Sequence, residues 1–251
     1  MKIAIVGYGR MGREIERAAQ NLGHEVVRKI DATADDADAR EVHADTLSAA
    51  THVIEFAAPN GIADRMKVYG NAGVPVVIGT TGMEGGVPAL KDMASSSGTN
   101  CLWGSNFSTG ANMLFRLSAL LSSWTNLLPE YDIAVHEEHH RQKLDSPSGT
   151  ARTIAEAIIE ASERKTTILT EYPQRALADS ELHVSSTRHG QVAGLHRVSL
   201  DSLADQIKVE HIAKSRAGFA VGAVRAAQWL TGRSGFHTAQ DFFNDILPMS
   251  L

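Results

Sequence analysis

The spacing of apolar positions changes several times along the chain, and each change predicts a different element. The apolar run at residues 2–6 predicts a buried strand, and residues 26–30 predict a second strand that ends at Asp31. Between these strands, apolar residues recur at the spacing of one helix face: Met11, Ile15, Ala18, Ala19 and Leu22. The chain therefore begins with a predicted strand, helix and strand.

Three further apolar runs, at residues 53–56, 74–78 and 100–103, predict more strands. Helices are predicted between them, from Ile62 onward and again over residues 87–96. Strands that alternate with helices in this way are typical of a parallel sheet covered by helices. The first part of the chain is therefore predicted to be a Rossmann-type domain of the α/β class.

The pattern changes after an apolar helix that is predicted to run from Asn112 to Trp124. Four segments then alternate as strands do, with one predicted helix between the first two: 131–136, 182–187, 195–200 and 207–212. This order favours an α+β layer with a mixed or mostly antiparallel sheet. A last helix, from Arg216 to Leu230, is expected to return to the first domain. The predicted domains are residues 1–108 with 218–251, and residues 109–217.

A dinucleotide-binding fingerprint, G-x-G-x-x-G, directly follows the first predicted strand. It is formed by Gly7-Tyr8-Gly9-Arg10-Met11-Gly12. Gly7 allows the tight turn, Gly9 lets the backbone approach a pyrophosphate, and Gly12 lets helix and strand pack closely. The motif alone is a weak signal, but here it lies between a predicted strand and helix. Asp31 then follows nineteen residues after Gly12. This setting predicts a dinucleotide site.

Two observations bear on which dinucleotide binds. Asp31 favours NAD, because an acid at this position accepts hydrogen bonds from the ribose diol, and the next residue is Ala32 rather than arginine. Arg10, Arg28 and Lys29 are near enough in sequence to meet a 2′-phosphate. NADP therefore stays an alternative.

The loop Gly79-Thr80-Thr81-Gly82 follows the strand predicted at residues 74–78. Cofactor crevices lie at the carboxyl ends of parallel strands. We therefore assign this loop to the nicotinamide end of the cofactor, with an ordinary Gly/Thr turn as the alternative.

The most strongly charged segment is residues 136–150, with three histidines, one lysine and three carboxylates. Ser146 and Pro147 are predicted to be the N-cap and the first residue of a helix. That helix is indicated by an apolar stripe: Ala151, Ile154, Ala155, Ile158 and Ile159. A helix start favours anions, and Lys143 with two histidines adds donors. The segment is therefore an anion-binding candidate, with a solvated polar loop as the alternative.

Residues His136–His140 also match H-E-x-x-H, the motif of zinc proteases. That motif needs its two histidines one helical turn apart on the same face. Here His136 closes a predicted strand, so no metal is expected, and a zinc hydrolase built on His136 and His140 is the less favoured alternative.

Composition narrows the class of protein. The 251 residues are 43% hydrophobic and 21% charged, with a formal net charge of −5, which argues against a general nucleic-acid surface. No apolar run approaches the length of a membrane span, and no cleavable leader precedes the first predicted strand. Cys101 is the single cysteine, which excludes a disulfide within the chain. These features predict a cytoplasmic protein that binds neither nucleic acid nor membrane.

Together these motifs resemble the 4-hydroxy-tetrahydrodipicolinate reductase (dihydrodipicolinate reductase) family of lysine and diaminopimelate biosynthesis. The resemblance covers nearly the whole chain. Its most specific part is Glu138–Ala151, which is similar to the family signature E-x-H-H-x-x-K-x-D-x-P-S-G-T-A. Further segments that fit are Asn106–Ser108, Ser186–Gly190, Gly194–His196 and His211–Phe219.

The resemblance implies a role for particular residues. His139 would be the proton donor or acceptor and Lys143 the second proton donor, while His140, Lys143, Gly149 and Thr150 would hold the carboxylates of the substrate. The cofactor, NADH or NADPH, would lie against the fingerprint, Asp31, the Gly79–Thr81 loop and a further loop made of Gly104, Ser105, Asn106 and Phe107. The second domain would bind the substrate and would also join the subunits into a homotetramer.

Two alternatives besides the zinc hydrolase stay open. One is another two-domain NAD(P)-dependent dehydrogenase that acts on amino or sugar acids. The other is a nucleotide-sensing protein that keeps the fingerprint without the chemistry. The proximity of His139, Lys143 and a helix start in the sequence argues against a sensor.

Overall fold

The structure, a computed structural model, describes residues 1–248, and the chain divides into two compact units. The first unit combines Met1–Thr109 with the chain from Arg216 onward, and the second is Gly110–Ser215. No helix among the described residues is long and apolar enough to span a membrane.

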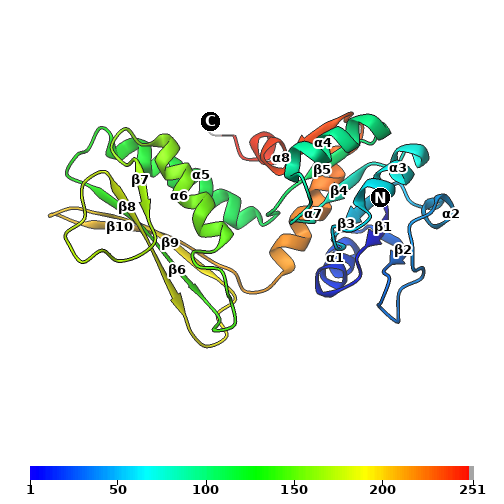
Figure 1. Cartoon of the computed structure of the whole chain (residues 1–251), viewed down its shortest axis with the longest axis horizontal. Helices are drawn as coiled ribbons and strands as arrows, with labels where there is room; N and C mark the ends of the chain where they lie inside the picture. Colours follow the sequence, from blue (N-terminus) through cyan, green and yellow to red (C-terminus); the bar gives the residue numbers. More distant parts are fainter. Residues whose placement is uncertain (249–251) are drawn as a thin grey trace. The chain divides into compact units, whose positions relative to one another are not determined.

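The first unit contains a six-stranded parallel sheet with helices on both faces (Figure 1). Its strands are β1 (Lys2–Val6), β2 (Glu25–Ile30), β3 (His52–Glu55), β4 (Val76–Ile78), β5 (Cys101–Trp103) and β11 (Phe236–Thr238). Its helices are α1 (Arg10–Asn21), α2 (Ala44–Leu47), α3 (Ile62–Ala72), α4 (Gly86–Ser97), α7 (Ala217–Leu230) and α8 (Ala239–Ile246).

The two faces of this sheet bury alternate residues of the same strands, as an extended strand requires. In β1, Ile3 and Ile5 pack with α1, α7 and α8, whereas Ala4 and Val6 pack with α3 and α4. A strand that is buried on both faces has a continuous apolar sequence, and this is why polar and apolar residues do not alternate in β1. The predicted Rossmann-type fold is confirmed.

The order of the strands fixes the place of the crevice. The sheet runs β11-β5-β4-β3-β1-β2, so the chain goes from β1 to one edge and then returns to the other side of β1 as β3. Ligands of open α/β sheets bind at such a switch point, beyond the carboxyl ends of the strands. The fingerprint Gly7–Gly12 directly follows β1 and therefore lies at this point.

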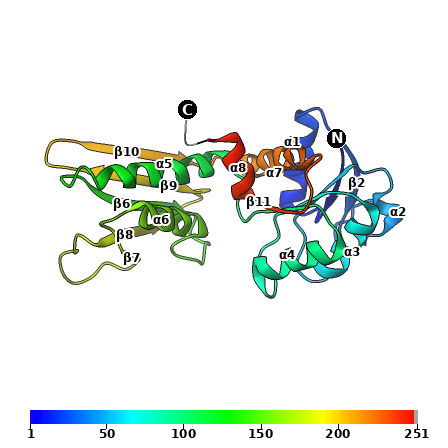
Figure 2. The ribbon, with the colours of Figure 1, turned by 90° about the horizontal axis from the view of Figure 1, so that it is seen from above.

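The second unit is a mixed five-stranded sheet with α5 (Thr109–Thr125) and α6 (Gly149–Ala161) on one face (Figure 2). Its strands are β6 (Asp132–His139), β7 (Thr167–Leu169), β8 (Glu181–Arg188), β9 (Leu195–Asp201) and β10 (Gln206–Ile212), in the order β10-β9-β6-β8-β7. The central strand β6 is parallel to β8 and antiparallel to β9. The predicted α+β layer with a mixed sheet is confirmed.

Two boundaries predicted around the charged segment are wrong. The strand does not end at His136 but continues to His139, because β8 and β9 pair with it along this stretch: Arg188 opposes His139 and Leu195 opposes Glu138. His139 is therefore a strand residue and not part of the loop.

The helix also begins later than predicted. Its N-cap is Ser148, whose Oγ accepts a hydrogen bond from the amide of Ala151 at 3.2 Å. Ser146 and Pro147, joined by a cis peptide bond, precede the helix. The amide of Ser148 donates to the Glu137 carboxylate at 2.9 Å, which fixes the start of α6 against β6.

Candidate functional site

Two of the three fingerprint glycines, Gly7 and Gly12, occupy positions that leave no room for a larger residue. Gly7 has φ +89°, and a Cβ there would lie 2.5 Å from the backbone of Phe56 and Ala57. A Cβ at Gly12 would lie 2.3 Å from the carbonyl oxygen of Gly7. In contrast, a Cβ at Gly9 would meet nothing within 4 Å. Gly7 and Gly12 are thus required by packing, whereas Gly9 leaves space on the side where a pyrophosphate would approach.

Asp31 follows β2 and reaches the fingerprint loop. One carboxylate oxygen accepts from the amide of Tyr8 at 2.7 Å, and the other accepts from the amides of Thr33 at 2.8 Å and Ala34 at 2.9 Å. Partial burial acts to raise the pKa of Asp31, but these hydrogen bonds outweigh it and lower the pKa below its usual value. Asp31 therefore stays ionised beside the turn.

Cations gather around the ring of Tyr8 next to this carboxylate. The Arg13 guanidinium lies 4.7 Å from the ring centre and also forms an ion pair with Asp36 at 2.6 Å. The ammonium of Lys29 lies 5.3 Å from the same ring centre. A negative and a positive group therefore both border the place where an adenosine ribose would bind.

The loops that follow β3, β4 and β5 meet at the carboxyl edge of the sheet. Thr80 donates through Oγ1 to the carbonyl of Ala57 at 2.9 Å, and the indole of Trp103 donates to the carbonyl of Thr80 at 3.0 Å. The rings of Phe56 and Phe107 are 6.1 Å apart. The Gly79–Thr81 and Gly104–Phe107 segments, assigned from the sequence to the cofactor, therefore lie together in one unit.

In the second unit, a buried carboxylate supports His139. Glu137 is fully buried and His139 is 7% exposed, both on the face of β6 that α6 covers. Glu137 Oε2 lies 3.3 Å from His139 Nδ1 and 3.5 Å from His196 Nε2. The two imidazole rings meet edge to face, 5.1 Å apart.

The other oxygen of Glu137 is held by three donors. Oε1 accepts from the amide of Ser148 at 2.9 Å, from Ser186 Oγ at 2.8 Å and from Arg188 Nη2 at 2.8 Å. Burial alone would raise the pKa of Glu137, but the hydrogen bonds from its histidine and arginine partners hold the pKa far below its ordinary value. Burial also lowers the pKa of His196.

The predicted carboxylate-binding residues lie just beyond this cluster. His140 follows β6, and its carbonyl accepts from the amide of Lys143 at 3.1 Å. The Lys143 ammonium contacts Asp145 at 2.7 Å. Gly149 and Thr150 form the first turn of α6. The turn between β6 and α6 thus combines a cation with a helix start.

The metal-site geometry of H-E-x-x-H is absent from residues 136–140. β6 continues through His139, so His136 lies in a strand rather than on a helix, and the two histidines of the motif do not lie one helical turn apart. Within residues 1–248, Glu137, His139 and His196 are the one group of three metal-type donors close together. Arg188 Nη2 also contacts the Glu137 carboxylate of this group, at 2.8 Å.

Comparison with known proteins gives the family. The N-terminal and C-terminal profiles of dihydrodipicolinate reductase match residues 1–107 and 110–243. A 4-hydroxy-tetrahydrodipicolinate reductase of Christiangramia forsetii is 34% identical over 98% of this chain and 99% of its own. One of Natronomonas pharaonis is 36% identical over 96% and 99%. The chain belongs to the dihydrodipicolinate reductase family.

A solved structure shows the same fold. The dipicolinate-bound dihydrodipicolinate reductase from Paenisporosarcina sp. TG-14 has a TM-score of 0.77 at 21% identity, over 98% of this chain and 99% of that one. Dihydrodipicolinate reductases are NAD(P)H-dependent oxidoreductases of lysine and diaminopimelate biosynthesis. The reaction class, the cofactor type and the pathway predicted from the sequence are therefore confirmed for this family member.

Four residues of the candidate site received no role from the sequence: Glu137, Ser148, Arg188 and His196. A partial signal was present, because Glu137 and Ser148 stand at the E and the S of the quoted family signature, and Arg188 and His196 lie in the family-like segments Ser186–Gly190 and Gly194–His196. Their convergence on one carboxylate depends on the pairing of β6 with β8 and β9.

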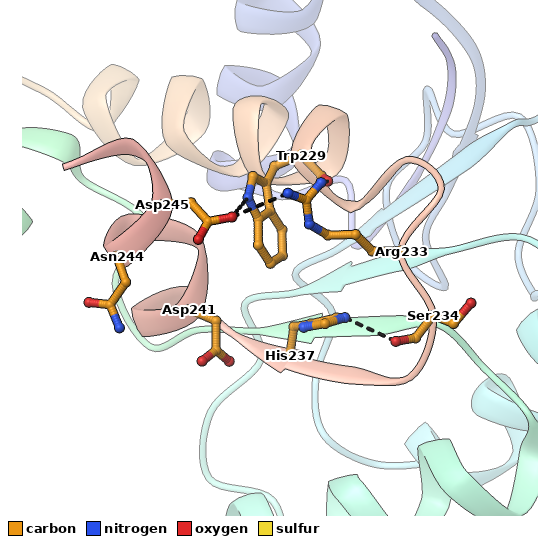
Figure 3. Close-up of a pocket in the computed structure, with 7 residues that line it drawn as sticks. All are labelled: Trp229, Arg233, Ser234, His237, Asp241, Asn244 and Asp245. Atoms are coloured by element: carbon orange, nitrogen blue, oxygen red, sulfur yellow. Dashed lines mark hydrogen bonds and ion pairs between the residues drawn. The ribbon is translucent and has the colours of Figure 1, made fainter. Parts of the chain in front are cut away.

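A separate pocket lies in the first unit between α7, α8 and β11 (Figure 3). The Trp229 indole donates to Asp245 at 2.9 Å, and the Arg233 guanidinium stacks 4.1 Å from the Trp229 ring centre. These groups satisfy one another, and none of the predicted cofactor or substrate residues lines this pocket. It therefore contributes nothing to the assignment of the site.

Proposed function

We propose that this chain reduces dihydrodipicolinate, formed by loss of water from 4-hydroxy-tetrahydrodipicolinate, to tetrahydrodipicolinate, with His139 and Lys143 as the proton donors. The bound dihydronicotinamide supplies the hydride. The ring that accepts a hydride gains electron density, so an acid within reach must deliver a proton to it. His139 and Lys143 are the acids beside the predicted carboxylate site.

The observation that carries this proposal is the hydrogen bond from the Ser148 amide to Glu137 at 2.9 Å. It joins the strand that ends in His139 to the first turn of α6, where Gly149 and Thr150 lie. A dicarboxylate needs cations and amide donors, and a helix start with a nearby lysine provides both. Proton donor and anion site are thereby held on rigid elements of one unit.

NADH or NADPH would bind along the carboxyl edge of the first unit's sheet. The fingerprint Gly7–Gly12 would receive the pyrophosphate, and Asp31 would accept from the adenosine ribose. The nicotinamide would lie against Gly79, Thr80 and Thr81 and the loop made of Gly104, Ser105, Asn106 and Phe107.

The functional form would be a cytoplasmic homotetramer. In the second unit, α5 and α6 cover only one face of the sheet. The other face carries polar pairs, among them Arg197 with Glu210 at 2.5 Å and His136 with Ser185 at 2.8 Å. Association through this sheet face would leave the His139 cluster, which lies on the opposite face, free to bind the substrate.

The test is steady-state kinetics of His139→Gln and Lys143→Ala in an assay coupled to the synthase that supplies the substrate. Loss of a positioned general acid should lower kcat by roughly a hundredfold to ten thousandfold. His139→Gln should change KM little, whereas Lys143→Ala should also raise KM because it removes a carboxylate contact. NADH affinity should be unchanged in both variants. Near-parental kcat in both folded variants would show that the proposed donors are wrong.

A further inference from the structure

We propose that Glu137 is the positioning residue of this site: it fixes the tautomer and orientation of His139 with one oxygen and the start of α6 with the other. The proposal rests on the proposed function, because it assumes that His139 delivers the proton. Glu137 itself is fully buried under His139 and touches neither substrate nor cofactor in this scheme.

The contacts of His139 decide which nitrogen can donate. Nδ1 faces Glu137 Oε2 at 3.3 Å, an ion-pair contact, and neither of these two buried atoms has a hydrogen bond of good geometry to any other group among residues 1–248. An ionised carboxylate accepts only, so Nδ1 must carry a proton in both charge states of the ring. The transferable proton is then on Nε2, which lies beside Gly194, where an added Cβ would be 3.1 Å away.

The same carboxylate links the proton donor to the anion site. Its Oε1 accepts from the amide of Ser148, the N-cap residue of α6, as well as from Ser186 and Arg188. Glu137 therefore holds both the imidazole and the helix start in fixed positions. In metal sites, a carboxylate that orients an imidazole commonly contributes about tenfold to a hundredfold to activity, and an effect of similar size is expected here.

Glu137→Gln would replace a hydrogen-bond acceptor with a donor at the position that faces the histidines. The three donors at Oε1 need an acceptor, so the amide oxygen of the glutamine would stay there. Its NH₂ group would then face His139 and His196, where an acceptor is required. His139 would lose the acceptor that holds the proton on Nδ1, while the Ser148 amide at the start of α6 would keep its acceptor.

The expected result is a split between kcat and KM. In Glu137→Gln, kcat should fall by about tenfold to a hundredfold, with KM close to the wild-type value because Ser148 and α6 keep their acceptor.

Glu138→Gln is the matched control. Glu138 lies one residue further along β6 on the opposite face, where it also pairs with two histidines: His136 at 3.3 Å and His189 at 3.1 Å. This variant removes a carboxylate that lies on the same strand and also contacts two histidines, and it should keep the parental kcat. If Glu137→Gln and Glu138→Gln behave alike, the proposal is wrong.

A second measurement avoids any loss of stability in the variant. In ¹⁵N-histidine-labelled wild-type protein, the His139 resonances, assigned by their absence from His139→Gln, should show Nδ1 protonated throughout the pH range of the folded state. A neutral His139 with its proton on Nε2 would overturn the proposal. If instead the wild-type chain has no reductase turnover, the proposed function fails and the tautomer result still decides the role of Glu137.

Discussion

Asp31 is the single residue on which the choice of cofactor most depends. Its carboxylate is ionised and shared among the amides of Tyr8, Thr33 and Ala34, so its charge is fixed at the end of β2. An acid here accepts from a ribose diol and repels a 2′-phosphate. The nearby Lys29 and Arg13 oppose this repulsion, and Arg13 is already paired with Asp36.

We predict that the wild-type chain uses NADH at least as well as NADPH, and that Asp31→Asn shifts the preference toward NADPH. Asparagine keeps an acceptor for the amides of Thr33 and Ala34 but removes the charge and the oxygen that accepts from the amide of Tyr8. A charge about 4 Å from a phosphate is worth about 1 kcal/mol in a solvated site, or roughly fivefold in selectivity. The shift in preference is measured as the ratio of kcat/KM with NADPH to kcat/KM with NADH. The control is Asp35→Asn, because Asp35 is an exposed neighbour of Asp31. A wild-type preference for NADPH of about a hundredfold, or about 2.7 kcal/mol, would contradict this assignment.

Residues differ in how far their roles can be foreseen from the sequence. Gly7 and Gly12 could be assigned because the positive φ of the turn at Gly7 and the close approach of Gly12 to the Gly7 carbonyl both arise within one strand–turn–helix unit. Glu137 could not, because three of its partners, Ser186, Arg188 and His196, are at least 49 residues away in the sequence. Only the sheet brings them together.

At the scale of elements, long periodic segments were predicted well and short ones were missed. α2, β7, β11 and α8 have between three and eight residues, too few for a pattern to repeat. The end of β6 was misplaced because its last residues are charged, and their partners lie on β8 and β9. The start of α6 was placed too early because Pro147 fits a first helical turn by composition.

The turn from β1 into α1 gives an element-scale prediction. Gly12→Ala should strongly destabilise the chain, because its Cβ would lie 2.3 Å from the Gly7 carbonyl and neither backbone segment can move freely. Gly9→Ala has open space and should melt close to wild type, but it should bind NADH much more weakly because the methyl occupies the approach of the pyrophosphate.

Thermal melting and fluorescence titration with NADH separate the two effects. Gly23→Ala is unsuitable as a control because the φ of Gly23 is +77°, which an alanine rarely adopts. Ala18→Gly, within α1, is used instead and reports the effect of a general loss of helix stability. Equal affinity of Gly9→Ala and wild type for NADH would place the pyrophosphate elsewhere.

At the scale of the whole molecule, the proposed function divides the reaction between the two units. The first unit has a Rossmann-type sheet with its fingerprint at the switch point, and the second has the histidine–carboxylate cluster beside a helix start. The chain leaves the first unit after α5 begins and returns through α7, whose residues pack against α1 and β3. Two crossings of the chain between the units permit each to fold around its own core.

The most direct test of this account is turnover by the intact chain. The synthase-coupled assay should show oxidation of NADH or NADPH that depends on the ring substrate, and a cofactor deuterated on its transferable hydrogen should yield tetrahydrodipicolinate that carries the deuterium. A folded chain that binds the dinucleotide yet oxidises neither cofactor when the synthase supplies substrate would contradict the account.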